Sequence, residues 1–162
     1  MREIIPQPLT AEAFAPFGEV IEASDRGDAI NYGYTVRFND LAEIDVSSGG
    51  GHAIVSLFRS QPIDPPRLKI FERHPQGSQA FVPLQGRPYL VAVAPAGVFD
   101  PTAIQVFRAG PAQGVNYRKG VWHHFVLAQA PDSDFLVIDR AGPGDNLDEI
   151  ELAEADQIVV AS

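Results

Sequence analysis

The residues best suited to chemistry stand close together, in residues 114–124. This stretch holds two of the four histidines, His123 and His124, together with Lys119 and the single tryptophan, Trp122. Histidine changes charge near neutral pH and is the commonest metal ligand, so an adjacent pair indicates acid–base catalysis or metal binding. A β-strand with one buried and one exposed ring explains the pair equally well, because two adjacent histidines are a weak motif.

A second group of polar residues lies on the segment 68–74, which has the composition of a strand. Side chains alternate between the two faces of a strand. Glu72 and His74 are therefore expected to point to one face, and Arg73 to the other.

The spacing around His74 matches a known pattern. Gln79 follows His74 after four residues, and Gly86 follows Gln79 after six. This is the spacing of the first cupin motif, HxHxxxxExxxxxxG, with Glu in place of the first His and Gln in place of the Glu. The second cupin motif ends in Gly-x-x-His, which residues 120–123 satisfy. The alignment predicts that four side chains line the mouth of one barrel: Glu72, His74, Gln79 and His123.

The same alternation separates the two adjacent histidines. On a regular strand His123 and His124 cannot both point inward. The cupin register sends His123 inward and leaves His124 for the outer face, a neighbouring subunit or a supporting role. Trp122 would share the face of His124, where a large aromatic side chain typically packs against another sheet or a partner.

Short strands are expected to hold these residues in place. Each candidate is rich in β-branched or aromatic residues and is bounded by turn residues. No helical pattern of 10–15 residues separates the strands, which favours a sandwich or barrel. The expected strands are residues 53–58, 68–74, 79–82, 89–94, 103–107, 120–127 and 135–139.

Other segments are expected to form a short helix and loops. A helix is predicted near residues 10–15, with Thr10 as its N-cap and Pro16 ending it. Residues 147–156 fit either a helix or an acidic edge strand. Loops are expected at residues 24–33 and 47–51, and His52 follows the second loop as a loop or interface residue.

Composition limits the classes of function. A chain of 162 residues is expected to form one domain spanning residues 1–162. The net charge of −9 argues against binding to nucleic acid, and no apolar run approaches a membrane span. The start of the sequence lacks the apolar core of a secretory signal, which favours the cytoplasm. The chain has no cysteine, so disulfides and thiolate nucleophiles are excluded.

Four phrases in order resemble the bacterial ureidoglycolate lyase family, formerly called ureidoglycolate hydrolases. The phrases are Glu-Arg-His-Pro-x-Gly-Ser-Gln-Ala-Phe (72–81), Gln-Gly-Val-Asn-Tyr (113–117), Gly-Val-Trp-His-His (120–124) and Asp-Phe-Leu-Val-Ile-Asp-Arg (134–140). The likeness extends from Phe14 to Asn146. It implies a mainly β fold, a cupin-like double-stranded β-helix barrel with few short helices, usually in a homodimer. It also implies cleavage of (S)-ureidoglycolate into glyoxylate and urea during allantoin breakdown.

The chain departs from the family pattern at three positions. Arg118 stands where the family commonly has His, Phe125 where Pro is frequent, and Leu147 where Cys is frequent. The first departure removes an acid–base group and adds a fixed positive charge. This departure has no functional effect if the Arg118 side chain is exposed, and otherwise could alter substrate preference.

The implied reaction needs a base and an acid. The base takes the hydroxyl proton while the C–N bond breaks, and the acid protonates the departing urea nitrogen. We expect His123 or His74 to be the base, and the other histidine or Glu72 to be the acid. Arginine suits the substrate carboxylate, because its planar fork makes two hydrogen bonds. The candidate substrate-binding residues are Arg73, Gln79, Arg118, Lys119 and Arg140.

A metal ion is an open alternative. His74, His123, Glu72 and Gln79 could hold a divalent ion such as Ni, Mn or Zn, although Gln is a weak ligand and the usual third His is missing. The lyase reaction can proceed without a metal, so no required cofactor is expected. Three rival functions remain: a metal-dependent cupin oxygenase or isomerase, a non-catalytic small-molecule-binding module, and a hydrolase that releases ammonia from the same substrate.

Overall fold

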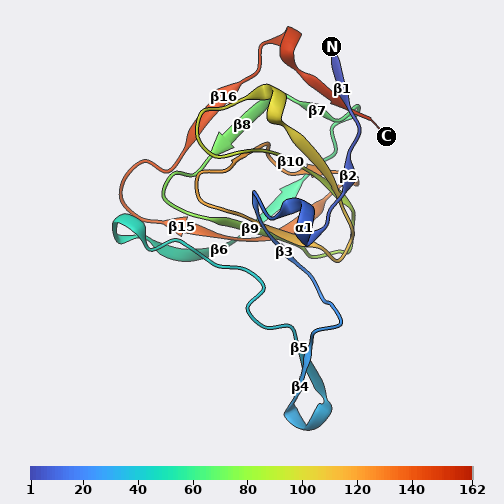
Figure 1. Cartoon of the computed structure of the whole chain (residues 1–162), viewed down its shortest axis with the longest axis vertical. Coiled ribbons are helices and arrows are strands. Elements are labelled where there is room, and N and C mark those ends of the chain that lie inside the picture. Colours follow the sequence, from blue (N-terminus) through green and yellow to red (C-terminus); the bar gives the residue numbers. More distant parts are fainter. Residues whose placement is uncertain (162) are drawn as a thin grey trace.

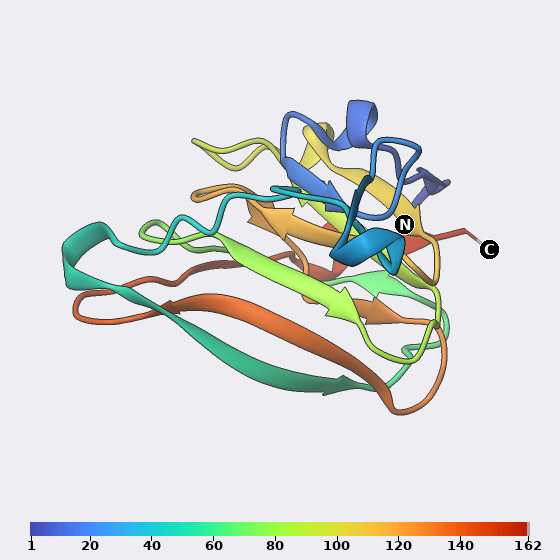
Figure 2. The same ribbon diagram turned by 90° about the horizontal axis from the view of Figure 1, so that it is seen from below.

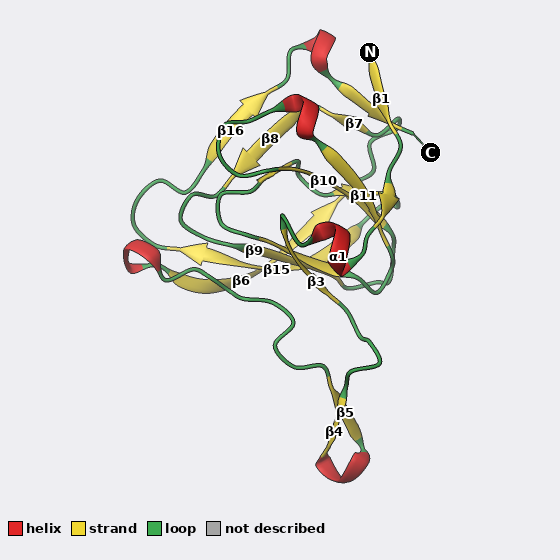
Figure 3. Ribbon diagram, viewed as in Figure 1, coloured by secondary structure: helices red, strands yellow, loops and turns green. Residues whose placement is uncertain are grey.

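The structure is a computed structural model that describes residues 1–161, and β-strands dominate it (Figure 3). Its one short α-helix, α1 (Ala11–Phe14), begins where the sequence predicts, because the Thr10 side chain accepts a hydrogen bond from the Ala13 N–H at 3.1 Å. Four short 3₁₀ turns connect strands: η1 (Asn31–Gly33), η2 (Ser48–Gly50), η3 (Pro101–Ala103) and η4 (Glu154–Asp156). The expected mainly β, cupin-like fold is confirmed. No helix in residues 1–161 has the length and apolar character to cross a membrane.

Two large sheets form the body of the molecule (Figures 1 and 2). The first runs in the order β16 (Asp148–Glu151), β8 (Ile70–Arg73), β13 (Trp122–His123), β10 (Tyr89–Ala94), β11 (Gln105–Ala109) and β2 (Gln7–Pro8), with β14 (Leu127–Ala128) also paired to β10. The second runs β3 (Gly18–Ile21), β12 (Gly114–Tyr117), β9 (Gln79–Pro83), β15 (Ser133–Ala141) and β6 (His52–Ser60).

Two smaller sheets complete the fold. One joins the two ends of the chain, in the order β1 (Arg2–Ile4), β17 (Ile158–Val160) and β7 (Arg67–Leu68). The other is a hairpin of β4 (Asp28–Ile30) and β5 (Thr35–Arg37), which projects well away from the body (Figure 1).

Strand β10 explains how the core is organised. All six of its residues are buried, as expected for a continuous apolar run. Tyr89, Val91 and Val93 point into the space between the two large sheets, where Phe81 and Phe135 meet them from the second sheet. The alternate residues of β10 point the other way and pack against the small sheet of the chain ends, in a cluster that includes Leu90, Ala92, Ala94, Leu68, Trp122 and Ile158.

Several predicted boundaries were wrong. Residues 120–127 do not form one strand, because the chain leaves the ladder after β13 and rejoins β10 only at β14. Residues 24–33 are not simply a loop, since they contain β4 and one end of the projecting hairpin. The strand expected at residues 103–107 begins two residues later, after η3. Of the two alternatives for residues 147–156, the acidic edge strand is the one found, as β16, and a 3₁₀ turn follows it. Six other strands were not predicted from the sequence: β1, β2, β3, β5, β12 and β17.

Candidate active site

Two neighbouring strands bring the candidate catalytic residues together. Strands β8 and β13 are antiparallel, and Glu72 pairs directly with His123 in their register. His74 follows β8 on the same face as Glu72. Ligand atoms of these three residues all lie within 4.8 Å of one another, as expected from the alternation that joined Glu72 to His74 and the cupin spacing that added His123. We refer to Glu72, His74 and His123 as the central cluster.

Gly120 fixes the turn before β13. Its φ of +80° lies in the left-handed region that favours glycine, and its N–H donates to the His74 carbonyl at 3.0 Å. The glycine of the Gly-x-x-His motif therefore ties the turn to the end of β8. This contact sets the position from which His123 enters the cluster.

His123 is buried and held between rings. Its imidazole stacks on Tyr117 with centroids 4.2 Å apart and an interplanar angle of 1°, and its centroid lies 5.3 Å from that of His74. Nδ1 lies 3.3 Å from the His124 carbonyl and 3.9 Å from Glu72 Oε1, while Nε2 has no hydrogen-bond partner among residues 1–161. Burial lowers the pKa of His123 to about 3, with a further contribution from the neighbouring His74. His123 is therefore a neutral ring at neutral pH.

His124 points away from the cluster, as the alternation predicted. Its Nε2 accepts the Lys69 N–H at 3.1 Å, its Nδ1 donates to the Phe125 carbonyl at 2.8 Å, and its ring meets Phe71 edge to face. Burial lowers its pKa to about 4. Trp122 lies on the same side in the second core cluster and donates to the Gly97 carbonyl. Both side chains support the strand.

Glu72 is the only carboxylate of the cluster, and its side chain keeps 30% of its exposure. Burial raises its pKa above the usual glutamate value. The nearby His74 opposes this shift, whereas Glu149, its neighbour on β16, adds to it. A carboxylate with a raised pKa in a partly open position is suited to proton transfer near neutral pH.

A line of hydrogen bonds holds His74. Its Nδ1 lies 2.8 Å from the Asn146 carbonyl, and its Nε2 lies 3.1 Å from Gln79 Oε1. The Gln79 amide nitrogen in turn donates to Asp139 Oδ2 at 3.0 Å. Gln79 thus adjoins the cluster, as its spacing predicted. Asn146 and Asp139 were missed, although Asp139 lies on β15, the strand that pairs with β9.

The four basic candidates for substrate binding lie elsewhere and have protein partners. Arg73 points to the opposite face, bonded to Asp148 at 2.8 Å and stacked over the Trp122 ring. Arg118 is exposed and donates to the Ala15 carbonyl. Within the described part of the chain, none of the four makes a hydrogen bond or ion pair with a side chain of the central cluster.

Lys119 and Arg140 hold loops at one end of the molecule. Lys119 Nζ donates to Ser48 Oγ at 2.7 Å and lies 3.3 Å from Asp45. Arg140 is buried, and its guanidinium donates to the Ser48 and Pro143 carbonyls. A Cβ at Gly51 would collide with this guanidinium, which explains the glycine. These contacts make Arg140 a clamp between two loops.

The central cluster also offers a carboxylate oxygen and imidazole nitrogens, a donor set that suits Ni, Mn or Zn. Both nitrogens of His74 already face oxygen atoms, and Gln79 Oε1 faces His74. An ion would therefore fit only by replacing the contact between Gln79 and His74, with Glu72 and His123 as its other ligands.

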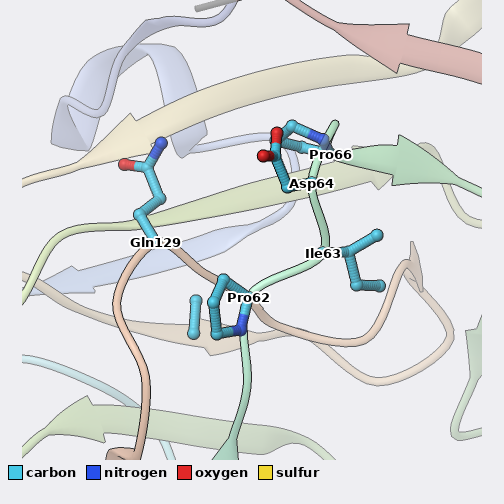
Figure 4. Close-up of a pocket in the computed structure, with 6 residues that line it drawn as sticks. Pro62, Ile63, Asp64, Pro66 and Gln129 are labelled. Carbon is cyan, nitrogen blue, oxygen red and sulfur yellow. The ribbon is translucent and has the colours of Figure 1, made fainter.

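A surface cavity lies away from the cluster. It has a volume of about 300 Å³ and is lined by Pro62, Ile63, Asp64, Pro66, Ala128 and Gln129 (Figure 4). Its lining offers one carboxylate and no histidine, so it lacks the paired acid and base that the cluster contains.

Comparisons with known proteins agree over almost the full sequence. The family model described as "Ureidoglycolate lyase" matches residues 1–160. A ureidoglycolate lyase of Burkholderia mallei is 53% identical over 157 residues, which cover 96% of this chain and 92% of the relative. Proteins of the same name from Pseudomonas syringae pv. syringae and Pseudomonas putida are 49% and 46% identical, each across 99% of this chain and 96% and 98% of the relatives.

Proposed function

The chain belongs to the ureidoglycolate lyase family, and we propose that it is a carbon–nitrogen lyase that splits (S)-ureidoglycolate into glyoxylate and urea. The observation that carries this proposal is the meeting of one carboxylate and two imidazoles within 4.8 Å. Such a cluster supplies the paired acid and base that the elimination needs, without a covalent nucleophile.

We assign the base role to Glu72, in place of the histidine base expected from the sequence. Its carboxylate is partly open, and its raised pKa makes it a better proton acceptor than an ordinary glutamate. It would take the hydroxyl proton of the substrate, so that the O–H electrons form the C=O bond of glyoxylate. The electrons of the breaking C–N bond then pass to the urea nitrogen.

We assign the acid role to His74, which faces oxygen acceptors from both ring nitrogens. Its Nε2 proton would pass from the contact with Gln79 Oε1 to the departing nitrogen and complete neutral urea. Proton exchange with water then restores both groups, so that no proton is gained or lost over a cycle. His123, neutral and stacked on Tyr117, would close the inner side of the cluster and present an uncharged ring beside Glu72.

A divalent ion, if bound by Glu72, His74 and His123, would supply a Lewis acid that polarises the substrate hydroxyl. The roles above need no such ion. Metal analysis of the purified protein, with turnover measured before and after chelation, separates the two cases. Turnover that falls to background with chelator and returns with one ion would make the site a metal centre.

The central test is a product assay. Purified protein is incubated with racemic ureidoglycolate, and glyoxylate, urea and ammonium are measured over time. Equal amounts of glyoxylate and urea are expected, with half of the racemate consumed. Ammonium in place of urea would show a hydrolase. Binding without turnover would show a binding module, and oxygen consumption with another substrate an oxygenase.

Matched variants test the two assigned roles. Glu72→Gln and His74→Asn should each lower kcat by about 10²–10⁴-fold, the usual contribution of a positioned acid or base. Glu151→Gln removes an exposed carboxylate from β16, and His52→Asn an exposed histidine at the start of β6, so both should turn over at the wild-type rate. Near-wild-type kcat in Glu72→Gln would refute its role as base.

We also propose that the protein is a homodimer that acts in the cytoplasm. Strand β6 supports the dimer, because it is a long edge strand with Val55 and Leu57 each 66% exposed. Leu57→Lys should shift the mass measured by light scattering toward the monomer. Val98→Lys, at an exposed site away from β6, should not. An unchanged mass in Leu57→Lys would place any interface elsewhere.

A further inference from the structure

Behind the central cluster, a buried amide separates a carboxylate from a catalytic ring. Gln79 retains 4% of its exposure, and its amide lies between Asp139 on one side and His74 on the other. Burying an amide is costly unless its polar atoms are paired. Both ends of this amide are paired, so the chain of hydrogen bonds has a defined direction from Asp139 through Gln79 to His74.

Asp139 sets that direction. The Asp139 carboxylate accepts the hydrogen bond, so the Gln79 NH₂ faces it. Turning the amide over would place two oxygen acceptors about 3 Å apart, at the distance that now separates Gln79 Nε2 and Asp139 Oδ2. With the NH₂ group committed to Asp139, Oε1 is left to face His74 Nε2 at 3.1 Å.

The direction is passed on to the ring. Nε2 of His74 faces an amide oxygen, and Nδ1 faces the Asn146 carbonyl. An amide oxygen cannot donate, so Nε2, the His74 nitrogen that faces it, is the donor in this contact. We propose that Asp139 is a positioning residue that, by orienting the Gln79 amide, holds the Nε2 nitrogen of His74 as a hydrogen-bond donor. The consequence for catalysis rests on the function proposed above.

The fold supports this arrangement. Ile138 is the last residue of β15 that pairs with β9, and its partner there is Ala80. Asp139 and Gln79 are the next residues on the two strands. Gln79 is also paired with Tyr117 on β12, the residue that stacks on His123. The amide is therefore held between two strands, and Asp139 lies in reach of no other hydrogen-bond partner among the described residues.

The test exchanges the two side chains. In Asp139→Asn the side chain can donate or accept, so the direction of the Gln79 amide is lost. Adding Gln79→Glu restores it, because the new amide at position 139 then donates to a carboxylate whose other oxygen accepts from His74. We expect kcat to fall about 10- to 100-fold in Asp139→Asn with little change in KM, and to recover at least partly in the double variant. Asp134→Asn, on the same strand but at the surface, serves as the control.

A second measurement does not depend on activity. Nitrogen-15 NMR of labelled histidine shows which ring nitrogens carry hydrogen, and His74 is assigned by the signal lost in His74→Asn. Hydrogen on Nε2 is expected for His74 in the wild type, and a bare Nε2 in Asp139→Asn. A wild-type His74 with a bare Nε2, or an Asp139→Asn variant with unchanged spectrum and kcat, would overturn the inference. A wild type that shows the expected spectrum but releases no urea would instead refute the proposed function.

Discussion

Mild acid should weaken the fold through the two adjacent histidines. His123 and His124 are buried as neutral rings, with pKa values lowered to about 3 and about 4 from the ordinary value of 6.5. The unfolded chain takes up protons on both rings as the pH falls through 6.5, whereas the folded protein does not until much lower pH. The two rings therefore leave the free energy of unfolding at its full value above pH 6.5. Below that pH the free energy of unfolding falls progressively, down to pH 3 to 4.

The size of this effect follows from linkage. Between pH 7.5 and pH 5, each unfolded histidine becomes almost fully protonated while its folded counterpart stays almost fully neutral. Each ring then costs about 2 kcal/mol of unfolding free energy, and the pair about 4 kcal/mol. Glu72 acts in the opposite direction, because its raised pKa makes the folded state take up its proton first. A comparison between variants removes that common term.

Urea unfolding at pH 7.5 and pH 5 measures the loss of unfolding free energy. The protein concentration is kept fixed, because a dimer would make stability concentration-dependent. His124→Gln keeps an acceptor for the Lys69 N–H but cannot titrate. It should lose about 2 kcal/mol less than the wild type between pH 7.5 and 5. His52→Gln, at an exposed position, should lose as much as the wild type. Equal losses in His124→Gln and the wild type would refute the reasoning.

Three further predictions follow from single contacts. Glu72→Gln should raise the melting temperature at pH 7.5. The pKa of Glu72 is raised in the folded state, so ionising this carboxyl group at pH 7.5 destabilises the folded protein. Scanning fluorimetry checks the sign, and a lower melting temperature would contradict it. Tyr89→Phe should cost about 1 kcal/mol or more in urea unfolding, since the Gln113 carbonyl loses a donor at 2.6 Å. Arg140→Met should lower the free energy of unfolding by about 2 kcal/mol, because the Ser48 and Pro143 carbonyls lose their donor. It should also speed amide hydrogen exchange in residues 47–51 and 142–146, and unchanged exchange there would argue against the clamp.

The central cluster could be predicted because a local rule grouped Glu72 with His74 and the cupin spacing added His123. Period-two alternation put Glu72 with His74, and Arg73 on the other face. The same rule separated His123 from His124, although the predicted strand 120–127 was too long. His124 lies just past β13, but its N–H still donates to the Ala92 carbonyl on β10, so the rule held over this short stretch.

The basic residues and the hairpin could not be placed in this way. Arginine and lysine side chains are long, and their partners come from distant segments, as when Lys119 meets Ser48 or Arg140 meets the Ser48 carbonyl. The β4–β5 hairpin has exposed residues on both faces and therefore no alternation of apolar and polar residues to reveal it. In both cases the structure is decided by contacts that sequence spacing does not encode.

The glutamine at position 79 explains how this site differs from the motif it resembles. The cupin pattern has a glutamate there, which would place a second negative charge against the cluster. Here the carboxylate lies one strand farther away, at Asp139, and reaches His74 only through a neutral amide. Glu72 is then the single carboxylate beside two rings, one with two hydrogen-bonded nitrogens and one neutral and buried. Such unequal surroundings are what allow neighbouring titratable groups to divide the roles of acid and base.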